Sequence, residues 1–268
     1  MMPQAVVALV LTLCMLGGVT PPGQVDTRKV DTRSLVAGAR AHMQRAEWNS
    51  AYEQLRRALQ QSPEDPEVLE ALGTAASELA QAEFKRLFAM APDSARVHQL
   101  MAESLETEDR RVEAETEYQA ALAAKPDLLD ALLGLAKLKR VRLDCDGAIA
   151  LYAKAEAIHS TFDAAYGLGI CYLRQQEDAR ALAHLEQAVA RDPRAAIAWV
   201  GLGSALLRVD RTADAIEKLR HATVLEPGMF DAYYMLGRAY RAAGDTTRAR
   251  DAFDKAEQVR SGGSAPPR

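Results

Sequence analysis

The segment from residue 230 to residue 259 carries two short apolar stripes. The first recurs at i, i+3, i+4 and i+7 and consists of Tyr233, Leu236, Gly237 and Tyr240. The second recurs at i, i+4 and i+7 and consists of Ala249, Phe253 and Ala256. Each spacing places its side chains on one face of a helix, and Gly244 separates the two stripes. Because small residues in both stripes let the two backbones approach closely, the segment predicts a helical hairpin.

The same pattern recurs toward the N-terminus at nearly constant spacing. Gly169, Gly203 and Gly237 follow one another at intervals of 34 residues. One earlier interval is 33 residues long, and the unit beginning at Pro66 is five residues short, which we interpret as a compressed turn between its two helices. The expected units are residues 32–65, 66–94, 95–128, 129–161, 162–195, 196–229 and 230–263.

The order of residues within each unit resembles the tetratricopeptide repeat (TPR). In the last unit, a large aromatic or leucine, Leu-Gly, Tyr, Ala, Phe and Ala follow one another in this order, and the earlier units repeat the pattern with the 34-residue period of that family. The resemblance covers about residues 32–263 and implies an all-α, right-handed superhelical solenoid of about seven helix-turn-helix repeats. It also implies that each repeat contacts only its neighbours and that binding surfaces are extended.

The N-terminal residues have a different composition. Residues 5–16 are almost entirely apolar, and glycines and prolines follow between residues 17 and 23. This run is short for a membrane span, so we expect residues 1–20 to be a signal peptide or a short membrane anchor. Lipid attachment at Cys14 is an alternative. We expect a polar linker at residues 21–31 and a disordered tail at residues 264–268. The protein is then exported by a bacterium to the periplasm or envelope, with a cytoplasmic location as the alternative.

Charge and residue spacing exclude several functions. The net charge of −4 and the pI near 5.8 argue against nucleic-acid binding. The five histidines lie in five different repeats and match no catalytic or metal-ligand spacing, so we expect no enzymatic activity, no metal and no cofactor. We expect Cys145 and Cys171 to be free thiols, the first on the surface in an inter-helix turn and the second in the core, although one disulfide between them is possible.

In the TPR family, the first helix of each repeat lines the concave face. The family's groove positions are acidic in the second and third repeats, at Glu67, Glu70, Glu78, Glu103 and Glu106. In the fourth repeat they hold Lys137 and Arg140. In the last three repeats they combine aromatic, aliphatic and arginine side chains, which are typical of binding hot spots. The candidate site residues are Tyr166, Ile170, Arg174, Ile197, Val200, Arg208, Tyr234, Arg238 and Arg241.

These features predict a non-enzymatic scaffold for protein–protein interactions. We expect it to be a monomer that binds a partner peptide or segment with interleaved acidic and apolar residues in the concave groove. Membrane contact is expected only through the N-terminal segment. The alternative is an accessory subunit of an envelope, secretion or enzyme complex that docks through its convex face.

Overall fold

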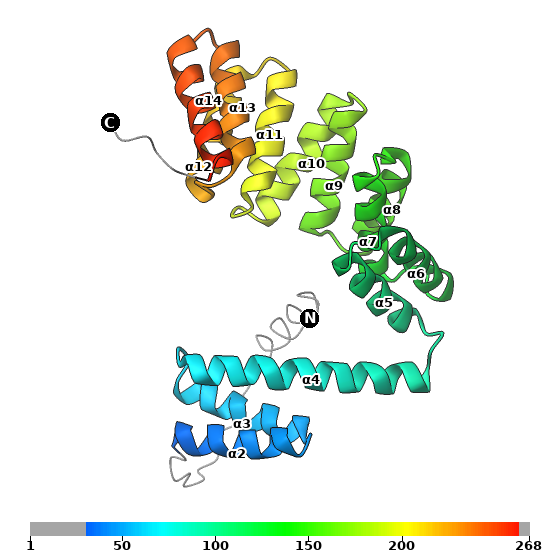
Figure 1. The fold of residues 1–268 in the computed structure, drawn as a ribbon. Coiled ribbons are helices and arrows are strands. Elements are labelled where there is room, and N and C mark those ends of the chain that lie inside the picture. Colours follow the sequence, from blue (N-terminus) through cyan, green and yellow to red (C-terminus); the bar gives the residue numbers. More distant parts are fainter. Residues whose placement is uncertain (1–30, 263–268) are drawn as a thin grey trace, which may run out of the picture. The chain divides into compact units, whose positions relative to one another are not determined.

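The computed structural model describes residues 31–262, and the described residues form thirteen helices and no strands (Figure 1). The all-α class expected from the sequence is therefore confirmed. The expectations for the signal segment, Cys14, most of the linker and the C-terminal tail fall outside the described residues. The chain divides after Ala124 into two compact units, which are described separately.

The second unit consists of four antiparallel helix pairs. They are α7 (Leu129–Val141) with α8 (Cys145–Ile158), α9 (Phe162–Arg174) with α10 (Asp178–Arg191), α11 (Ala196–Arg208) with α12 (Thr212–Leu225), and α13 (Phe230–Ala242) with α14 (Thr246–Arg260). Each second helix also packs on the first helix of the next pair. The result is a solenoid of helical hairpins.

Close backbone approach inside the last three hairpins depends on glycine. A Cβ atom at Gly169 would lie 2.6 Å from Leu185 Cγ, and one at Gly203 would lie 2.5 Å from Leu219 Cγ. A Cβ atom at Gly237 would lie 2.7 Å from the Phe253 ring. These separations are too short for a methyl group, so the large residue of the second helix fills the space that glycine leaves open.

A left-handed residue ends the first helix of six hairpins. All six have positive φ, and only one is glycine. They are Ala46, Asp109, Leu143, Gln176, Asp210 and Gly244. The amide that follows each of them donates to a carbonyl five residues earlier, for example Asp144 to Lys139 at 2.9 Å. This is the Schellman arrangement, which satisfies carbonyls at the helix end.

The first helices of the second unit lie on the inside of its curve. Contacts join α7 to α9, α9 to α11 and α11 to α13, whereas α8, α10, α12 and α14 do not contact one another. Because the first helices are closer together than the second helices, the stack bends toward the first helices. We call the resulting concave surface of α7, α9, α11 and α13 the groove.

The first unit departs from the expected repeat at residues 66–94. Its helices are α2 (Thr32–Gln44), α3 (Trp48–Gln61), α4 (Pro66–Met90), α5 (Ala95–Thr107) and α6 (Arg111–Ala124). The expected compressed turn is wrong, because α4 is a single helix of 25 residues. The missing five residues would have held the turn, and residues 74–83 contain neither glycine nor proline to end the helix.

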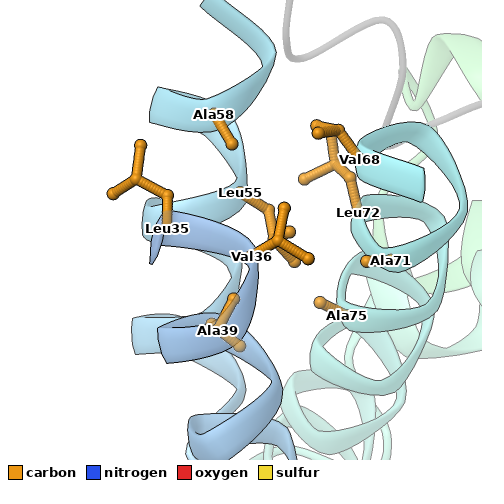
Figure 2. Close-up of a cluster of buried hydrophobic side chains, with 10 residues drawn as sticks. Leu35, Val36, Ala39, Leu55, Ala58, Val68, Ala71, Leu72 and Ala75 are labelled. Atoms are coloured by element: carbon orange, nitrogen blue, oxygen red, sulfur yellow. The ribbon is translucent and has the colours of Figure 1, made fainter. Parts of the chain in front are cut away.

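The first half of α4 completes a core with α2 and α3 (Figure 2). Leu35 and Val36 of α2, Leu55 of α3, and Val68 and Leu72 of α4 are among the buried residues of this cluster. The N-terminus of α4 is capped by the Asp65 carboxylate, which accepts from the Glu67 amide at 2.9 Å. The buried positions of α4 end at Ala76.

Candidate partner-binding groove

Tyr166 on α9 forms the centre of one aromatic cluster in the groove. Its ring stacks on Phe162 with centroids 5.7 Å apart, and the Arg140 guanidinium of α7 lies over it at 5.7 Å. Ile170 borders the same place, because a Cβ atom at Gly201 of α11 would lie 3.4 Å from Ile170 Cδ1 and 3.7 Å from Tyr166 Cε2. Three consecutive first helices therefore contribute to this cluster.

Electrostatics connect Tyr166 with the last repeat. Burial raises the pKa of the Tyr166 hydroxyl, the Arg140 guanidinium opposes the rise, and the Asp231 carboxylate of α13 adds to it. Asp231 lies at the start of α13, two repeats beyond Tyr166. The concave curvature thus brings α13 within electrostatic range of α9, across α11.

Tyr234 on α13 forms the second aromatic cluster. It stacks on Phe230 with centroids 5.7 Å apart and meets Phe253 of α14 edge-on at 5.7 Å. The Arg241 guanidinium lies 5.5 Å from the centroid of the Phe253 ring. Tyr234 nevertheless remains 42 % exposed, and Ile197 on α11, between α9 and α13, is 44 % exposed. Both side chains are accessible to a partner.

The remaining candidate residues differ in how available they are. Arg174 and Arg238 are exposed. Arg208 Nε donates to the Asp178 carboxylate at 2.5 Å, so that guanidinium is already engaged. Val200 is only 8 % exposed and contributes to the core rather than to the open surface.

In the first unit, several glutamates at the positions expected to line a groove also have partners within the chain. Glu67 is paired with Arg40 at 2.7 Å. Glu106 accepts from the Tyr118 hydroxyl at 3.0 Å, and Glu103 accepts from the Gln99 amide at 2.6 Å. These internal contacts reduce the capacity of the acidic positions to bind a basic partner.

Sequence reasoning missed the contribution of Phe162 and Phe230 to the site. Both occupy the first position of their repeat, four residues before Tyr166 and Tyr234. That i, i+4 aromatic spacing is a signal for stacking on one helix face. The sixth repeat, with Ala196 at the first position, lacks it.

The two described cysteines are free thiols, as expected, but both are buried. The predicted surface position of Cys145 is wrong, because this residue begins α8 and faces α9. Burial, together with a hydrogen bond to Cys145, raises the pKa of the Cys171 thiol to about 12. Asp146, the residue after Cys145, accepts a hydrogen bond from the Gln175 side-chain amide at 2.6 Å. This hydrogen bond also joins α8 to the end of α9.

The described residues contain neither a cluster of metal ligands nor a helix that could span a membrane. Within residues 31–262, no group of three or more His, Cys, Asp or Glu side chains is arranged to hold a metal ion. None of the helices in the same range combines the length and apolar character needed to cross a bilayer.

Solved structures share the fold at low sequence identity. YrrB, described as a TPR protein with an unusual peptide-binding site, is 22 % identical with a TM-score of 0.56, covering 67 % of this chain and 93 % of YrrB. A MamA structure is 25 % identical with a TM-score of 0.53, covering 60 % of this chain and 94 % of its own. MamA from Desulfovibrio magneticus RS-1 is 20 % identical with a TM-score of 0.58, covering 64 % of this chain and 97 % of the MamA chain.

Family comparison agrees with the structural likeness. No curated protein sequence matches the chain significantly. Tetratricopeptide-repeat models match residues 33–75, 133–185, 179–223 and 205–266, which include half of the chain in its C-terminal part alone. The chain therefore belongs to the tetratricopeptide repeat family, whose members generally serve as non-enzymatic scaffolds for protein interactions.

Proposed function

We propose that the groove of the second unit binds an extended or helical segment of another protein, in which apolar and acidic residues alternate. The observation that carries this proposal is the presence of two aromatic clusters, around Tyr166 and Tyr234, on one concave surface. Each tyrosine offers a large amphipathic area with few rotatable bonds to immobilise. Exposed arginines on the same two helices provide donors for carboxylates.

The distribution of charge favours an acidic rather than a basic partner. Arg174 and Arg238 are exposed on α9 and α13, the helices that carry the two aromatic clusters, whereas Glu67 in the first unit is already paired with Arg40. The peptide-binding site named for YrrB supports a peptide as the kind of ligand that this fold accepts. We therefore assign the partner contact to the second unit.

A peptide library displayed on phage provides the direct test. The immobilised full chain is used to select binders, and the affinity of a synthetic selected peptide is then measured by isothermal titration calorimetry. Tyr234→Ala combined with Arg238→Ala should weaken binding at least about thirtyfold, because truncation of a central anchor commonly costs about 2 kcal/mol. Glu67→Ala combined with Glu70→Ala is the matched control and should change the affinity less than about threefold.

The outcome of this comparison separates the groove from other surfaces. Circular dichroism must show that both double variants retain the helical content of the wild type. Selected peptides enriched in basic residues, with binding lost only in the glutamate variant, would contradict the proposal and place the contact in the first unit.

Convex-face docking is the second candidate, and one cleft favours it. The cleft has a volume of about 440 Å³ and is bordered by Trp199 of α11 and by Lys218, His221 and Val224 of α12. Val224 is 75 % exposed, and the Trp199 ring meets His221 edge-on at 4.7 Å. If Val224→Asp abolishes binding of the selected peptides while the Tyr234 and Arg238 double variant retains it, the convex cleft is the binding site.

A further inference from the structure

The second repeat retains the packing residues of a hairpin that its own chain does not close. In the fifth, sixth and seventh repeats, a glycine of the first helix receives a large residue from sixteen positions later, as Gly203 receives Leu219. Allowing for the five missing residues, the corresponding pair in the second repeat is Gly73 and Phe84. Both residues are present, but they lie on the same continuous helix.

Gly73 and Phe84 cannot meet within α4. Eleven residues of helix separate them by about 16 Å along the axis. A Cβ atom at Gly73 would have no neighbour within 4 Å, unlike the equivalent glycines of the other hairpins. Phe84 is only partly buried and borders a cleft of about 490 Å³ with Met101 and Leu105 of α5. The space above Gly73 and one side of Phe84 are therefore open.

A stripe of exposed and half-buried apolar residues runs along α4. Val68, Ala71 and Ala75 are covered by the packing on α2 and α3, but no residue beyond Ala76 is buried, and Figure 1 shows α4 running past the ends of both helices. The stripe follows the helical period and consists of the exposed Leu69, Gly73 and Phe88 and the half-buried Ala80 and Phe84. Leu69 is 48 % exposed and Phe88 is 46 % exposed.

We propose that a second copy of this chain covers the stripe, with the two α4 helices packed antiparallel about a two-fold axis near residues 78 and 79. Phe84 of each copy then fills the space above Gly73 of the other. The pair of fused helices reproduces two hairpin interfaces between chains, which is the arrangement of a domain-swapped, isologous dimer. This inference concerns the first unit, is independent of the groove and replaces the monomer expected from the sequence.

A second contact, seen in the sixth repeat, supports the same register. In the sixth repeat Trp199 contacts His221, 22 positions later. The corresponding residues of the second repeat are Leu69 and Arg86, and the antiparallel arrangement brings them together between copies. It also places the acidic Glu70 beside the partner's Arg86, so the charges are complementary at both ends of the helix pair.

Sedimentation equilibrium of the full chain tests the dimer. The wild type should be a dimer at micromolar concentration, and Phe84→Asp should raise the dissociation constant by at least about 100-fold, since each dimer contains two such buried anchors. Ala82→Asp adds the same charge two positions earlier on an exposed side of the helix and should change it less than about threefold. A wild type that is monomeric at 50 µM, roughly the upper end of micromolar affinity, would overturn the proposal.

Cysteine cross-linking tests the antiparallel register while leaving Gly73 and Phe84 intact. In a chain whose three native cysteines are replaced by alanine, Leu69→Cys and Arg86→Cys are introduced together. Diamide accepts two electrons and two protons from a pair of thiols and leaves a disulfide. The double variant should form a covalent dimer on a non-reducing gel, and Leu69→Cys alone should not.

The remaining outcomes of the cross-linking experiment contradict the proposal. A disulfide within one chain, seen as a monomer of altered mobility that is reversed by dithiothreitol, would show that α4 bends and closes its own hairpin. A dimer of the wild type that persists in Phe84→Asp would show that the copies associate through another surface.

Discussion

The substitution Gly203→Ala tests the packing of the hairpins most directly. The added methyl group would lie 2.5 Å from Leu219 Cγ and 2.8 Å from Leu219 Cδ2. Leu219 is fully buried, so it cannot move toward solvent to make room. Such overpacking typically costs about 1–3 kcal/mol, against a gain of about 0.5–1 kcal/mol for alanine over glycine in a helix interior. Because the Leu219 contacts are shorter than 3.0 Å, the upper part of the overpacking range applies, and we expect a net loss of about 1–2 kcal/mol in the free energy of unfolding.

Urea unfolding measures this loss, followed by the fluorescence of Trp199 in the same repeat. Trp48→Phe removes the other tryptophan of the chain, so the signal reports on the sixth repeat. Gly228→Ala is the matched control, because a Cβ atom there would have no neighbour within 4 Å. This control should change the free energy by less than about 0.5 kcal/mol, as is usual for surface substitutions.

A double-mutant cycle tests the cause of the loss. Leu219→Ala alone should cost about 2–5 kcal/mol through the cavity it leaves. The methyl group of Gly203→Ala then partly fills that cavity, so the double variant should be more stable than the sum of the single effects by about 1 kcal/mol or more. If Gly203→Ala leaves the midpoint unchanged, or if the two effects simply add, the assigned contact between Gly203 and Leu219 is wrong.

Three further predictions concern the second unit. Leu143→Gly should stabilise the chain by up to about 1 kcal/mol, because Leu143 has φ of 69° and is 61 % exposed. Gly244→Ala should destabilise the chain, because Gly244 also has positive φ. Thermal melts of both variants test this, and a lower melting temperature for Leu143→Gly than for the wild type would contradict it. Ala215→Leu should cost about 1–3 kcal/mol and broaden the urea transition, because Ala215 is fully buried and repeats unfold as coupled neighbours; an unchanged transition would refute the expected register. Cys171, with a pKa of about 12, should react with iodoacetamide at pH 8 far more slowly in the folded chain than in guanidinium, and equal labelling rates would contradict its burial. Its contribution to stability should be complete below the unfolded thiol pKa of about 8.5 and should be lost as the pH rises toward 12.

Local sequence determined the helical hairpins of this protein. Apolar stripes at helical spacing, with glycine or alanine where two helices touch, specify which face of each helix is buried, as Gly237 and Phe253 illustrate. The constant period then specifies how each hairpin stacks on the next. These properties follow from the sequence because every repeat packs only on its neighbours, so few contacts depend on residues far away in the chain.

The second repeat shows where matching a pattern was insufficient. Leu69, Leu72, Gly73 and Phe84 fit the family order, and the pattern therefore predicted a hairpin. Continuous helix formers between the two halves decided otherwise, since no residue there ends a helix. The information was local, but helix propensity over residues 74–83 outweighed the family pattern in α4.

The candidate site was only partly determined by the sequence. Family positions identified Tyr166, Tyr234 and the exposed arginines, but they did not distinguish the buried Val200 or the engagement of Arg208 by Asp178. They also gave no sign that Asp231 acts on Tyr166 across α11. Those relations arise from the curvature of the stack, which depends on how closely the first helices approach one another, and that distance is decided by side-chain packing in three dimensions.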